Sequence, residues 1–311
     1  MLRPYKHFLS MDKTEKYLTH IQAQFPSLSV ISVRVNDQGQ SNDGLIVNEE
    51  FIFRFPKHPR ALRRLRMEYE ILRTLYGRTT LRIPNPICEQ MDTDVVGEAF
   101  YGYRLIPGEP FLQETFHSIR DETVVDRVAD QVATFLVELH GLQPGTDFEI
   151  SGSRRDSREE WVGLLTKIRE KLIPELNRKE SQEIIGTFET FLFEEDNFNY
   201  SPVLRHGDFG TVNVLYDRAG ERLSGVIDFG NAGLGDPALD FAAVLAPSFG
   251  YGEAFVSRLK RIYPFGEALL QRAQFYVKTF SLQEALYGLE HDNHRIFQEG
   301  LTEFFGQDNG V

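Results

Sequence analysis

The sequence predicts an α+β fold in two lobes: a small β-rich N-terminal lobe over residues 1–106 and a large, mainly helical C-terminal lobe over residues 107–311. Short apolar stretches with strand-like alternation recur between residues 28 and 106, separated by polar turns. After a Pro-Gly break at residues 107–108, stretches with helical periodicity dominate. A chain of 311 residues is long enough for one large domain or for two lobes.

Composition limits the class of protein and its partners. Apolar residues make up 41% and charged residues 26% of the chain, as in soluble globular proteins. The sequence has no signal-like apolar N-terminus and no apolar run of a membrane-spanning length. Cys88 is the single cysteine, which excludes an intrachain disulfide or a zinc cluster. We therefore expect a cytoplasmic monomer that does not act at membranes.

The net charge indicates which ligands suit this chain. At −12, it argues against nucleic acid as a partner. A negative surface favours the approach of a cationic small molecule, although many soluble proteins are acidic.

The first lobe is predicted from its pattern of apolar positions and turns. Residues 13–25 form an amphipathic helix that packs on the lobe, and residues 59–76 form a second helix. The expected strands cover residues 28–35, a segment beginning at residue 45, residues 51–55, 87–90 and 99–106. A polar, glycine-containing loop over residues 36–44 joins the first two strands.

The second lobe is predicted to be helical around one hairpin. The helices are expected over residues 121–142, 155–176, 182–194, 241–245, 252–263, 267–290 and 294–305. Apolar runs at residues 212–216 and 223–227 flank a turn and form the hairpin. We expect Trp161 to be a core residue and His140 to have a structural role.

Two short motifs flank that hairpin and carry the chemistry. Residues 206–213 read His-Gly-Asp-Phe-Gly-Thr-Val-Asn, and residues 227–230 read Ile-Asp-Phe-Gly. The same pieces occur in the same order in the protein-kinase signature. Phosphoryl transfer needs a carboxylate that orients and deprotonates the acceptor hydroxyl, a role that Asp208 can fill. Asn213 and Asp228 supply the hard oxygen ligands that Mg²⁺ prefers. Either motif alone reads as an ordinary turn.

These motifs resemble those of the aminoglycoside phosphotransferase family, the small-molecule branch of the protein-kinase-like fold. The family's loop reads H-G-D-x-x-x-x-N, its metal aspartate lies in I-D-F/W-G, and residues 235–240 match its G-D-P-x-x-D. Features from residue 100 onward are most similar to the 2″-type enzymes. The resemblance implies a bilobal protein-kinase-like fold. It also implies Mg²⁺-dependent transfer of the γ-phosphate of ATP or GTP to a hydroxyl of an aminoglycoside.

The resemblance also places the nucleotide phosphates. Gly39, Ser41 and Asn42 match the family's G-x-S-N loop, although a polar loop alone is more often an ordinary hairpin. Arg54 occupies the position where the family usually has lysine. Lys57 is the competing cation, but strand alternation points it to the opposite face and a proline interrupts the strand before it.

Other residues are expected around the nucleotide. Ile52 shares the face of Arg54 and is a candidate contact for the base. The family's helix carries a glutamate that pairs with the phosphate-binding cation, and Glu68 matches it, with Glu70 as the competitor. The family's hinge corresponds to Arg104, Leu105 and Ile106, whose backbone groups would meet the purine.

A polycationic substrate requires carboxylates near the acceptor hydroxyl. Related 2″-type enzymes carry an acidic run before a Tyr-Gly pair, but residues 245–252 here contain no acid. Acidic and aromatic candidates remain in the last third of the chain; they are Glu253, Glu284, Glu290, Asp292, Phe280 and Tyr287. Their alternative interpretation is a solvated helix face and core aromatics.

Two further functions remain open from the sequence. A kinase of the same fold could act on a macrolide, a choline-like compound or a sugar. A pseudokinase that only binds nucleotide is a more distant alternative, and the intact Asp208, Asn213 and Asp228 argue against it.

Overall fold

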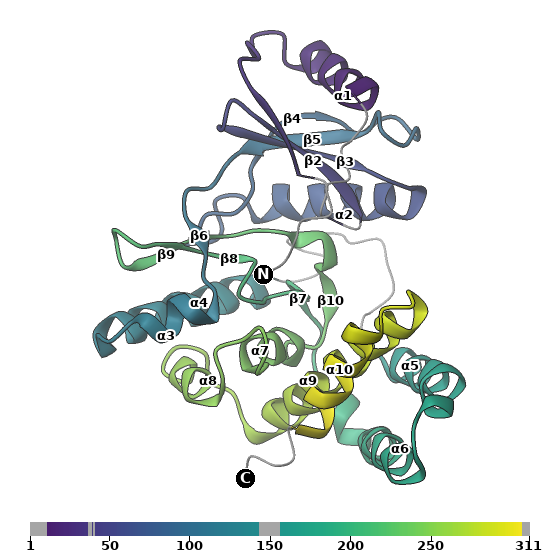
Figure 1. The fold of residues 1–311 in the computed structure, drawn as a ribbon. Helices are drawn as coiled ribbons and strands as arrows, with labels where there is room; N and C mark the ends of the chain where they lie inside the picture. Colours follow the sequence, from purple (N-terminus) through teal and green to yellow (C-terminus); the bar gives the residue numbers. More distant parts are fainter. Residues whose placement is uncertain (1–10, 37–38, 40, 143–155, 307–311) are drawn as a thin grey trace. The chain divides into compact units, whose positions relative to one another are not determined.

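The computed structural model describes residues 11–36, 39, 41–142 and 156–306, and they divide into two compact units (Figure 1). Unit 1 contains the described residues up to Pro110 and the segment 213–232. Unit 2 contains the described residues of 111–212 and 233–306. Unit 1 is rich in β-structure and unit 2 is mainly helical, so the predicted fold class is confirmed.

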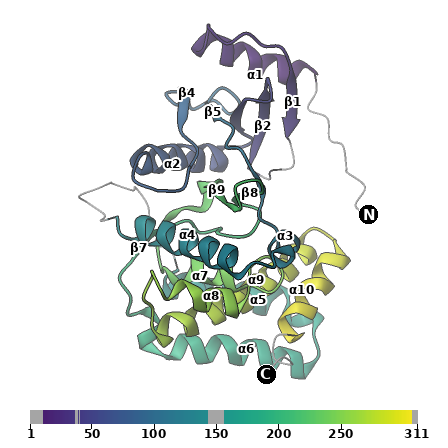
Figure 2. The same cartoon turned by 90° about the vertical axis from the view of Figure 1, so that its left-hand side faces the viewer.

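Unit 1 contains one antiparallel five-stranded sheet in the order β1-β2-β3-β5-β4. Its elements are α1 (Met11–Gln24), β1 (Val33–Asn36), β2 (Asn42–Val47), β3 (Phe51–Pro56), α2 (Pro59–Leu75), β4 (Pro86–Gln90) and β5 (Phe100–Arg104). Helix α1 lies on one side of the sheet and α2 on the other (Figures 1 and 2). Each face of the sheet is therefore covered by a different helix.

Aromatic side chains fill the core between α1 and the sheet. Tyr17 of α1 stacks on Phe55 of β3 with ring centroids 3.9 Å apart, and Phe55 stacks in turn on Phe100 of β5 at 4.9 Å. All three are fully buried. Such stacked pairs add directional attraction to the burial of apolar area. The predicted packing of the first helix on this lobe is confirmed.

The first strand is shorter than predicted, because β1 begins only at Val33. The Oδ1 atom of Asn48 accepts hydrogen bonds from the backbone N–H groups of Ile31 and Ser32, at 2.7 and 3.1 Å. These N–H groups are thus satisfied by a side chain and not by a neighbouring strand. The exposed side chain of Ile31 is consistent with a segment outside the sheet.

The predicted hairpin is present and belongs to unit 1. Strands β8 (Val214–Asp217) and β9 (Arg222–Val226) pair, and the short strand β6 (Glu109–Pro110) pairs with β8. This pairing explains why residues 107–110 and 213–232 group with the first lobe, whereas the sequence suggested one boundary after residue 106. The 3₁₀ turn η3 (Phe229–Asn231) follows the hairpin.

Unit 2 is built from helices around a short two-stranded sheet, β7 paired with β10. Its earlier elements are α3 (Gln113–Ser118), α4 (Glu122–His140), α5 (Arg158–Lys171), η1 (Ile173–Glu175), α6 (Arg178–Phe193), η2 (Glu195–Phe198) and β7 (Val203–Arg205). Its later elements are β10 (Gly233–Gly235), α7 (Ala238–Leu245), α8 (Glu253–Leu259), α9 (Glu267–Glu290) and α10 (His294–Gly306).

The predicted helices of unit 2 are present, with some ends displaced. The helix expected over 155–176 ends at Lys171, and a 3₁₀ turn containing Pro174 follows, because proline lacks the N–H that continues a helix. Trp161 is buried and stacks on Tyr276 of α9 at 4.9 Å, as expected of a core residue. Among the described residues, no helix combines the length and apolarity that crossing a membrane requires.

Gly102 of β5 gives a test of the sheet packing in unit 1. A Cβ atom there would lie 2.3 Å from ring atoms of the buried Phe53. We expect Gly102→Ala to lower the free energy of unfolding by about 1–3 kcal/mol, measured by chemical denaturation. Gly163 on α5 has open space around it, so Gly163→Ala should raise that free energy by about 0.5–1 kcal/mol. Equal effects of the two substitutions would contradict this packing.

Candidate active site

Unit 1 contains a cavity of about 350 Å³ that gathers most of the predicted nucleotide residues. It is lined by Asn36, Gly39, Ser41, Asn42, Asp43, Gly44, Ile52, Arg54, Arg64, Glu68, Tyr103, Ile227, Asp228, Gly230 and Asn231. Strands β1, β2, β3 and β5, helix α2 and the turn η3 all contribute to the wall.

The guanidinium group of Arg54 connects three elements at this cavity. Its Nη1 atom lies 2.7 Å from Oε1 of Glu68 on α2, and its Nη2 atom lies 3.2 Å from Oδ1 of Asp228. With its amide turned so that Oδ1 faces Arg54, Asn42 accepts a further hydrogen bond from Nη2 at 3.1 Å. The predicted pairing of Arg54 with Glu68 is confirmed. The competitor, Glu70, is exposed on α2.

Glu68 pairs with Arg54 in a strongly buried setting. The Glu68 side chain is 1% exposed and that of Arg54 is 13% exposed. Burial raises the pKa of Glu68 to about 7, and the positive charge of Arg54 opposes this rise. The pair is thus a fixed feature of the unit interior and not a surface contact.

The predicted phosphate loop lies at the wall of the cavity. Gly39, Ser41 and Asn42 all line it, while Gln40 lies outside the described residues. Lys57 donates from Nζ to the carbonyl oxygen of Gly39 at 2.5 Å, and from its backbone N–H to the carbonyl oxygen of Ser41 at 2.9 Å. Lys57 therefore fastens the loop at two points.

The structure brings Ile52 to the cavity but not the three hinge residues. Arg104, Leu105 and Ile106 are not among the lining residues. The backbone N–H of Leu105 donates to the carbonyl oxygen of Glu50 at 2.8 Å. The contact of this segment with a purine stays a prediction.

Tyr103 lines the cavity, and sequence reasoning missed it. A signal was present, because Tyr103 lies directly opposite Ile52 in the pairing of β3 with β5. Residues directly opposite on paired strands share a face of the sheet. Burial raises the pKa of the Tyr103 hydroxyl to about 12, so this group stays protonated at neutral pH.

Asp228 and Asn213 are positioned by the hairpin and the turn after it. Asp228 has a left-handed backbone with φ of 62°, and its Oδ1 accepts a hydrogen bond from the N–H of Gly230 at 3.4 Å. The N–H of Ile227 donates to the carbonyl oxygen of Asn213 at 2.9 Å, which ties the two predicted metal ligands together along the hairpin.

The two side chains differ in their environment. The Asp228 side chain is 48% exposed and lines the cavity, whereas Asn213 is buried and is not among the lining residues. The described residues contain no group of three or more His, Cys, Asp or Glu side chains placed to hold a metal ion. Two hard oxygen donors suit Mg²⁺, which protein sites commonly hold with one or two carboxylates, waters and substrate phosphates.

The loop that carries Asp208 lies in unit 2 and is held by a buried carboxylate. Asp240 accepts hydrogen bonds from the backbone N–H groups of His206 and Gly207, both at 2.8 Å. Its Oδ2 also lies 3.1 Å from Nε2 of His140. Asp208 itself is exposed on this loop. The structural role predicted for His140 is confirmed, because it positions the group that holds the loop.

The charge of Asp240 is stabilised despite complete burial. Burial acts to raise its pKa, but the hydrogen bond with His140 and the electrostatic interactions with His140, His206 and Arg205 outweigh it, so the pKa of Asp240 lies below its ordinary value. Both oxygens of a carboxyl group act purely as acceptors only when the group is ionised. The loop before Asp208 therefore depends on an ionised Asp240.

A second buried network in unit 2 was not predicted. Arg205, next to the loop, pairs with Asp156, with Nε 2.6 Å from Oδ2. Arg272 of α9 pairs with Asp236 in the same way at 2.6 Å, and the N–H of Asp236 donates to Oδ2 of Asp156. The G-D-P-x-x-D match in the sequence was the available signal, since both of its aspartates prove to be anchors.

The predicted substrate residues lie in separate places on unit 2. Phe280 lies 5.6 Å from Phe249 between ring centroids, and the carbonyl oxygen of Phe249 accepts a hydrogen bond from the N–H of Thr211 at 3.0 Å. These two aromatic residues therefore adjoin the loop of Asp208. Partial burial and the charges of Glu303 and Glu299 raise the pKa of Glu284. The sequence analysis did not identify Glu299 or Glu303 as candidate site residues.

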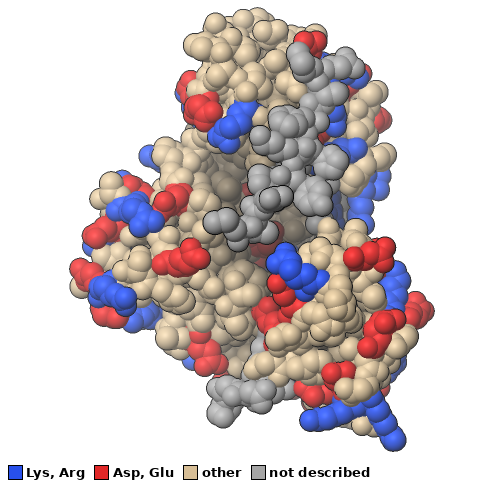
Figure 3. All heavy atoms as spheres, viewed as in Figure 1, with Lys and Arg blue, Asp and Glu red and all other residues tan. Residues whose placement is uncertain are grey.

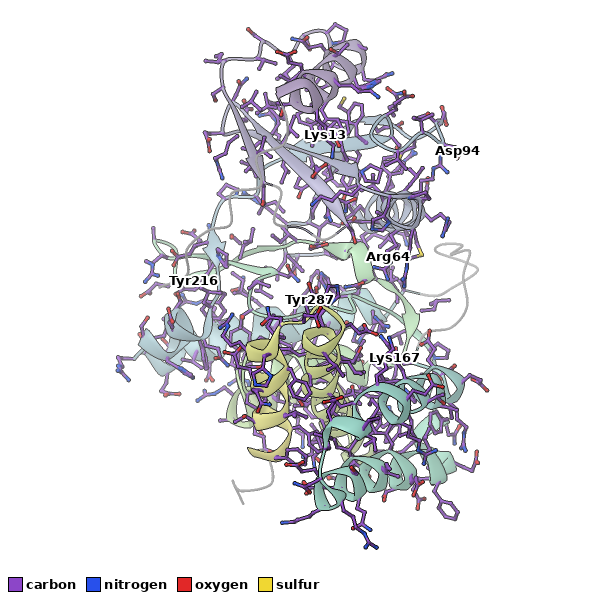
Figure 4. All side chains as sticks on the ribbon, turned by 45° about the vertical axis from the view of Figure 1, so that its right-hand side comes forward. Lys13, Arg64, Asp94, Lys167, Tyr216 and Tyr287 are labelled. Carbon is purple, nitrogen blue, oxygen red and sulfur yellow. The ribbon has the colours of Figure 1, made fainter. Side chains whose placement is uncertain are left out.

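The remaining candidates are solvent-exposed and Glu290 is already paired. Lys167 and Lys171 of α5 both contact Glu290, at 3.0 and 2.5 Å, which neutralises its charge. Tyr287 stacks on His291 at 4.0 Å and lies on the surface of α9 (Figure 4). Glu253 is exposed at the start of α8, and Asp292 is exposed in the turn between α9 and α10. Acidic and basic side chains lie close together over the face of unit 2 that Figure 3 shows.

Along the chain, the sheet and helix α2 are followed by the Asp208 loop and then by the Asp228 turn, the order expected of a kinase-like phosphotransferase. The chain belongs to the Phosphotransferase enzyme family, whose profile matches residues 32–276. Viomycin phosphotransferase from Streptomyces vinaceus is 25% identical over 268 residues, which cover 84% of this chain and 88% of that protein.

Solved structures share the whole fold. A GDP and kanamycin complex of APH(2″)-IIIa superposes with a TM-score of 0.84 at 25% identity, covering 95% of this chain and 99% of that chain. A macrolide 2′-phosphotransferase type I superposes with a TM-score of 0.70 at 19% identity, covering 96% and 98%. The second likeness shows the fold alone. The predicted fold and the family resemblance are confirmed.

Asp240 allows a test of how the Asp208 loop is held. In Asp240→Asn, one oxygen that accepts an N–H becomes a donor, so we expect the free energy of unfolding at pH 7 to fall by about 1–3 kcal/mol. Because the pKa of Asp240 is lowered in the folded state, its stabilisation is present at neutral pH and is lost as pH falls below about 4.

The measurement is chemical denaturation between pH 7 and pH 3. Asp240→Asn should show a weaker loss of stability on acidification than the parent protein. Asp130→Asn is the control, because Asp130 forms an exposed pair with Arg261 on the surface, worth about 0–1 kcal/mol. If the two variants are equally stable at pH 7, Asp240 does not hold the loop.

Proposed function

We propose that this protein transfers the γ-phosphate of ATP or GTP to a hydroxyl group of an aminoglycoside antibiotic, with Mg²⁺ as cofactor. The observation that carries the proposal is the cavity in unit 1 where Arg54 lies between Glu68 and Asp228. A cation fixed beside a loop of small residues is what binding a nucleotide phosphate requires. The GDP and kanamycin found with APH(2″)-IIIa support the nucleotide and the substrate class.

Asp208 has the role of general base in this proposal. Its carboxylate accepts the proton of the acceptor hydroxyl while the hydroxyl oxygen forms a bond to the γ-phosphorus. The bond between that phosphorus and the nucleoside diphosphate breaks in the same transfer. The exposure of Asp208 and the firm anchoring of the loop by Asp240 support the role.

Asp228 and Asn213 would hold the Mg²⁺ ion. When bound, Mg²⁺ neutralises charge on the phosphates and on the transferred group. The partial exposure of Asp228 at the cavity wall fits a ligand shared between protein and nucleotide. Gly39, Ser41 and Asn42 would meet the phosphates, Ile52 the base, and the segment 104–106 the purine edge.

The substrate side of the proposal depends on the surface next to the Asp208 loop. Phe280 and Phe249 supply an aromatic wall, and Glu284 lies one helical turn after Phe280 on α9. Carboxylates and aromatic faces both attract ammonium groups. Glu253, Tyr287 and Asp292 remain candidates by their exposure.

A macrolide is the second candidate substrate, favoured by one specific observation. Where related enzymes carry an acidic run, residues 245–252 are free of acids, and Phe249 of this stretch packs beside the loop. An apolar wall there would suit a less charged antibiotic. The name of viomycin phosphotransferase adds a third class of antibiotic to test.

Asp208→Asn tests the chemical step. The amide keeps the shape of the carboxylate but cannot accept the proton, so we expect kcat to fall about 10²–10⁴-fold. Nucleotide affinity, measured by calorimetry, should stay within about twofold because the substituted group does not contact the nucleotide in this proposal. Turnover close to that of the parent protein would remove Asp208 from the mechanism.

A panel of kanamycin, viomycin and a macrolide tests the substrate class through nucleotide turnover. If kanamycin is the substrate, KM should rise steeply with added salt, because exposed charge pairs are screened over about 8–10 Å. Glu284→Gln should then raise KM more than it lowers kcat, the sign of lost uniform binding. Glu290→Gln is the control, since that carboxylate is already paired with two lysines. Turnover of the macrolide alone would overturn the aminoglycoside proposal.

A further inference from the structure

Two buried ion pairs of unit 2 are joined at Asp156, in the segment before α5. Its carboxylate accepts hydrogen bonds from Nε and Nη2 of Arg205 at 2.6 and 3.1 Å, and from the backbone N–H of Asp236 at 3.2 Å. Its carbonyl oxygen accepts hydrogen bonds from the indole N–H of Trp161 at 3.2 Å and from the hydroxyl of Tyr200 at 2.8 Å. Asp156 thus links α5, β7 and the segments around Tyr200 and Asp236.

The second ion pair connects Asp236 to helix α9. Arg272 donates from Nε and Nη2 to the two carboxylate oxygens of Asp236, at 2.6 and 3.1 Å. The hydroxyl of Tyr276 donates to the same carboxylate at 2.8 Å. The two aspartates and two arginines of this network are at most 6% exposed, and their formal charges cancel.

Arg205 lies where the Asp208 loop begins. It is the last residue of β7, and the backbone N–H of the next residue, His206, donates to Asp240. The ion pair with Asp156 therefore fixes the end of the strand from which the loop starts.

Arg272 fixes the helix that carries candidate acceptor-binding groups. On α9, Arg272, Tyr276 and Phe280 follow one another at a spacing of four residues, and residues at that spacing share a helix face. Phe280 packs on Phe249, whose carbonyl oxygen accepts the N–H of Thr211 in the Asp208 loop. One face of α9 therefore begins at the ion pairs and ends beside the loop.

Stability alone gives no reason for these buried charges. Apolar side chains of similar volume often stabilise a protein as well as a buried ion pair does, or better. An ion pair differs because the planar fork of a guanidinium group bonds both oxygens of one carboxylate and so fixes direction. Phosphoryl transfer depends almost entirely on positioning and electrostatics, and a misplacement of about 1 Å can slow an enzyme 10²-fold.

We propose that Asp156 is a positioning residue for the phosphoryl acceptor, which holds the Asp208 loop and α9 in one fixed arrangement through Arg205 and Asp236. This inference rests on the proposed transfer of phosphate to an antibiotic hydroxyl with Asp208 as the base. Asp156 is buried and does not line the nucleotide cavity of unit 1, so it acts through its partners. Its loss should slow transfer to the acceptor and leave nucleotide binding intact.

The test removes both charges of the pair between Asp156 and Arg205 at once. In Asp156→Asn combined with Arg205→Met, neither partner is left as an unpaired buried charge, and Asn tolerates the left-handed φ of 63° at residue 156. With kanamycin as acceptor we expect kcat to fall about tenfold or more, because the hydroxyl is no longer aligned with Asp208. The Kd for Mg·ATP, measured by calorimetry on the full chain, should stay within about twofold of the parent value.

A second variant separates positioning from stability. Asp156→Asn alone leaves Arg205 buried without its carboxylate partner, so its melting temperature should fall below that of the double variant. At a temperature where both variants are folded, a positioning role lowers kcat in both, whereas a purely structural role leaves kcat of the folded protein at the parent value. Glu189→Gln is the control, because it loosens an exposed pair with Arg169 between α5 and α6 and should leave kcat and Kd unchanged.

The outcomes separate this inference from the function on which it rests. If the parent phosphorylates neither kanamycin, viomycin nor a macrolide, the proposed function fails at the acceptor and the inference fails with it. If the parent phosphorylates one of them and the double variant has the same kcat with it, only the role of Asp156 is overturned. A tenfold rise in the Kd for Mg·ATP would also overturn it, because the effect would then not be confined to the acceptor. Arg205→Lys, which keeps the charge but not the fork, replaces the double variant if the latter does not fold, and a kcat equal to the parent would again overturn the role.

Discussion

The hydrogen bonds of the buried Asp240 carboxylate are the interaction on which the part of unit 2 that carries Asp208 depends. It receives two backbone N–H groups of the loop that precedes Asp208, and it lies against His140 of α4. An ionised group in such a buried place is costly unless its hydrogen bonds are complete. The loop, α4 and α7 are therefore fixed to one another by a single charge. Asp208 can remain exposed without being mobile relative to its neighbours.

In unit 1 the corresponding interaction is made by the guanidinium group of Arg54. A lysine ammonium is a compact point charge, whereas the fork of Arg54 reaches Glu68 through one nitrogen and Asp228 through the other. The same guanidinium thus joins β3, α2 and the turn that carries the metal-ligand candidate. Binding of Mg²⁺ at Asp228 would remove one of these partners. Metal and nucleotide binding are expected to be linked for this reason.

Much of this arrangement could be predicted from local sequence pattern. The periodicity of residues 59–76 and 267–290 predicted helices that the structure contains. The two paired motifs identified Asp208, Asn213 and Asp228 as candidate site residues. The rest depends on contacts that have no local signature. Residues 28–32 lie outside the sheet, where the side chain of Asn48 accepts a hydrogen bond from the backbone N–H of Ile31. Tyr103 lines the cavity because it lies directly opposite Ile52 in the pairing of β3 with β5. Register and long-range hydrogen bonds are fixed only when the strands have paired.

The surface beside the Asp208 loop places two demands on a substrate. The N–H of Thr211 is bonded to Phe249, Phe249 packs against Phe280, and Ser248 donates to Glu303 of α10. Aromatic faces and carboxylates are therefore adjacent within unit 2. Partial burial raises the pKa of Glu284, and the negative charges of Glu303 and Glu299 raise it further. A ligand that carries ammonium groups on a rigid ring would relieve this repulsion and cover the rings, whereas a neutral ligand would only cover them. The carboxylates and aromatic rings of α9 and α10 would thus suit the cationic antibiotic proposed as substrate, although residues 245–252 themselves contain no acid.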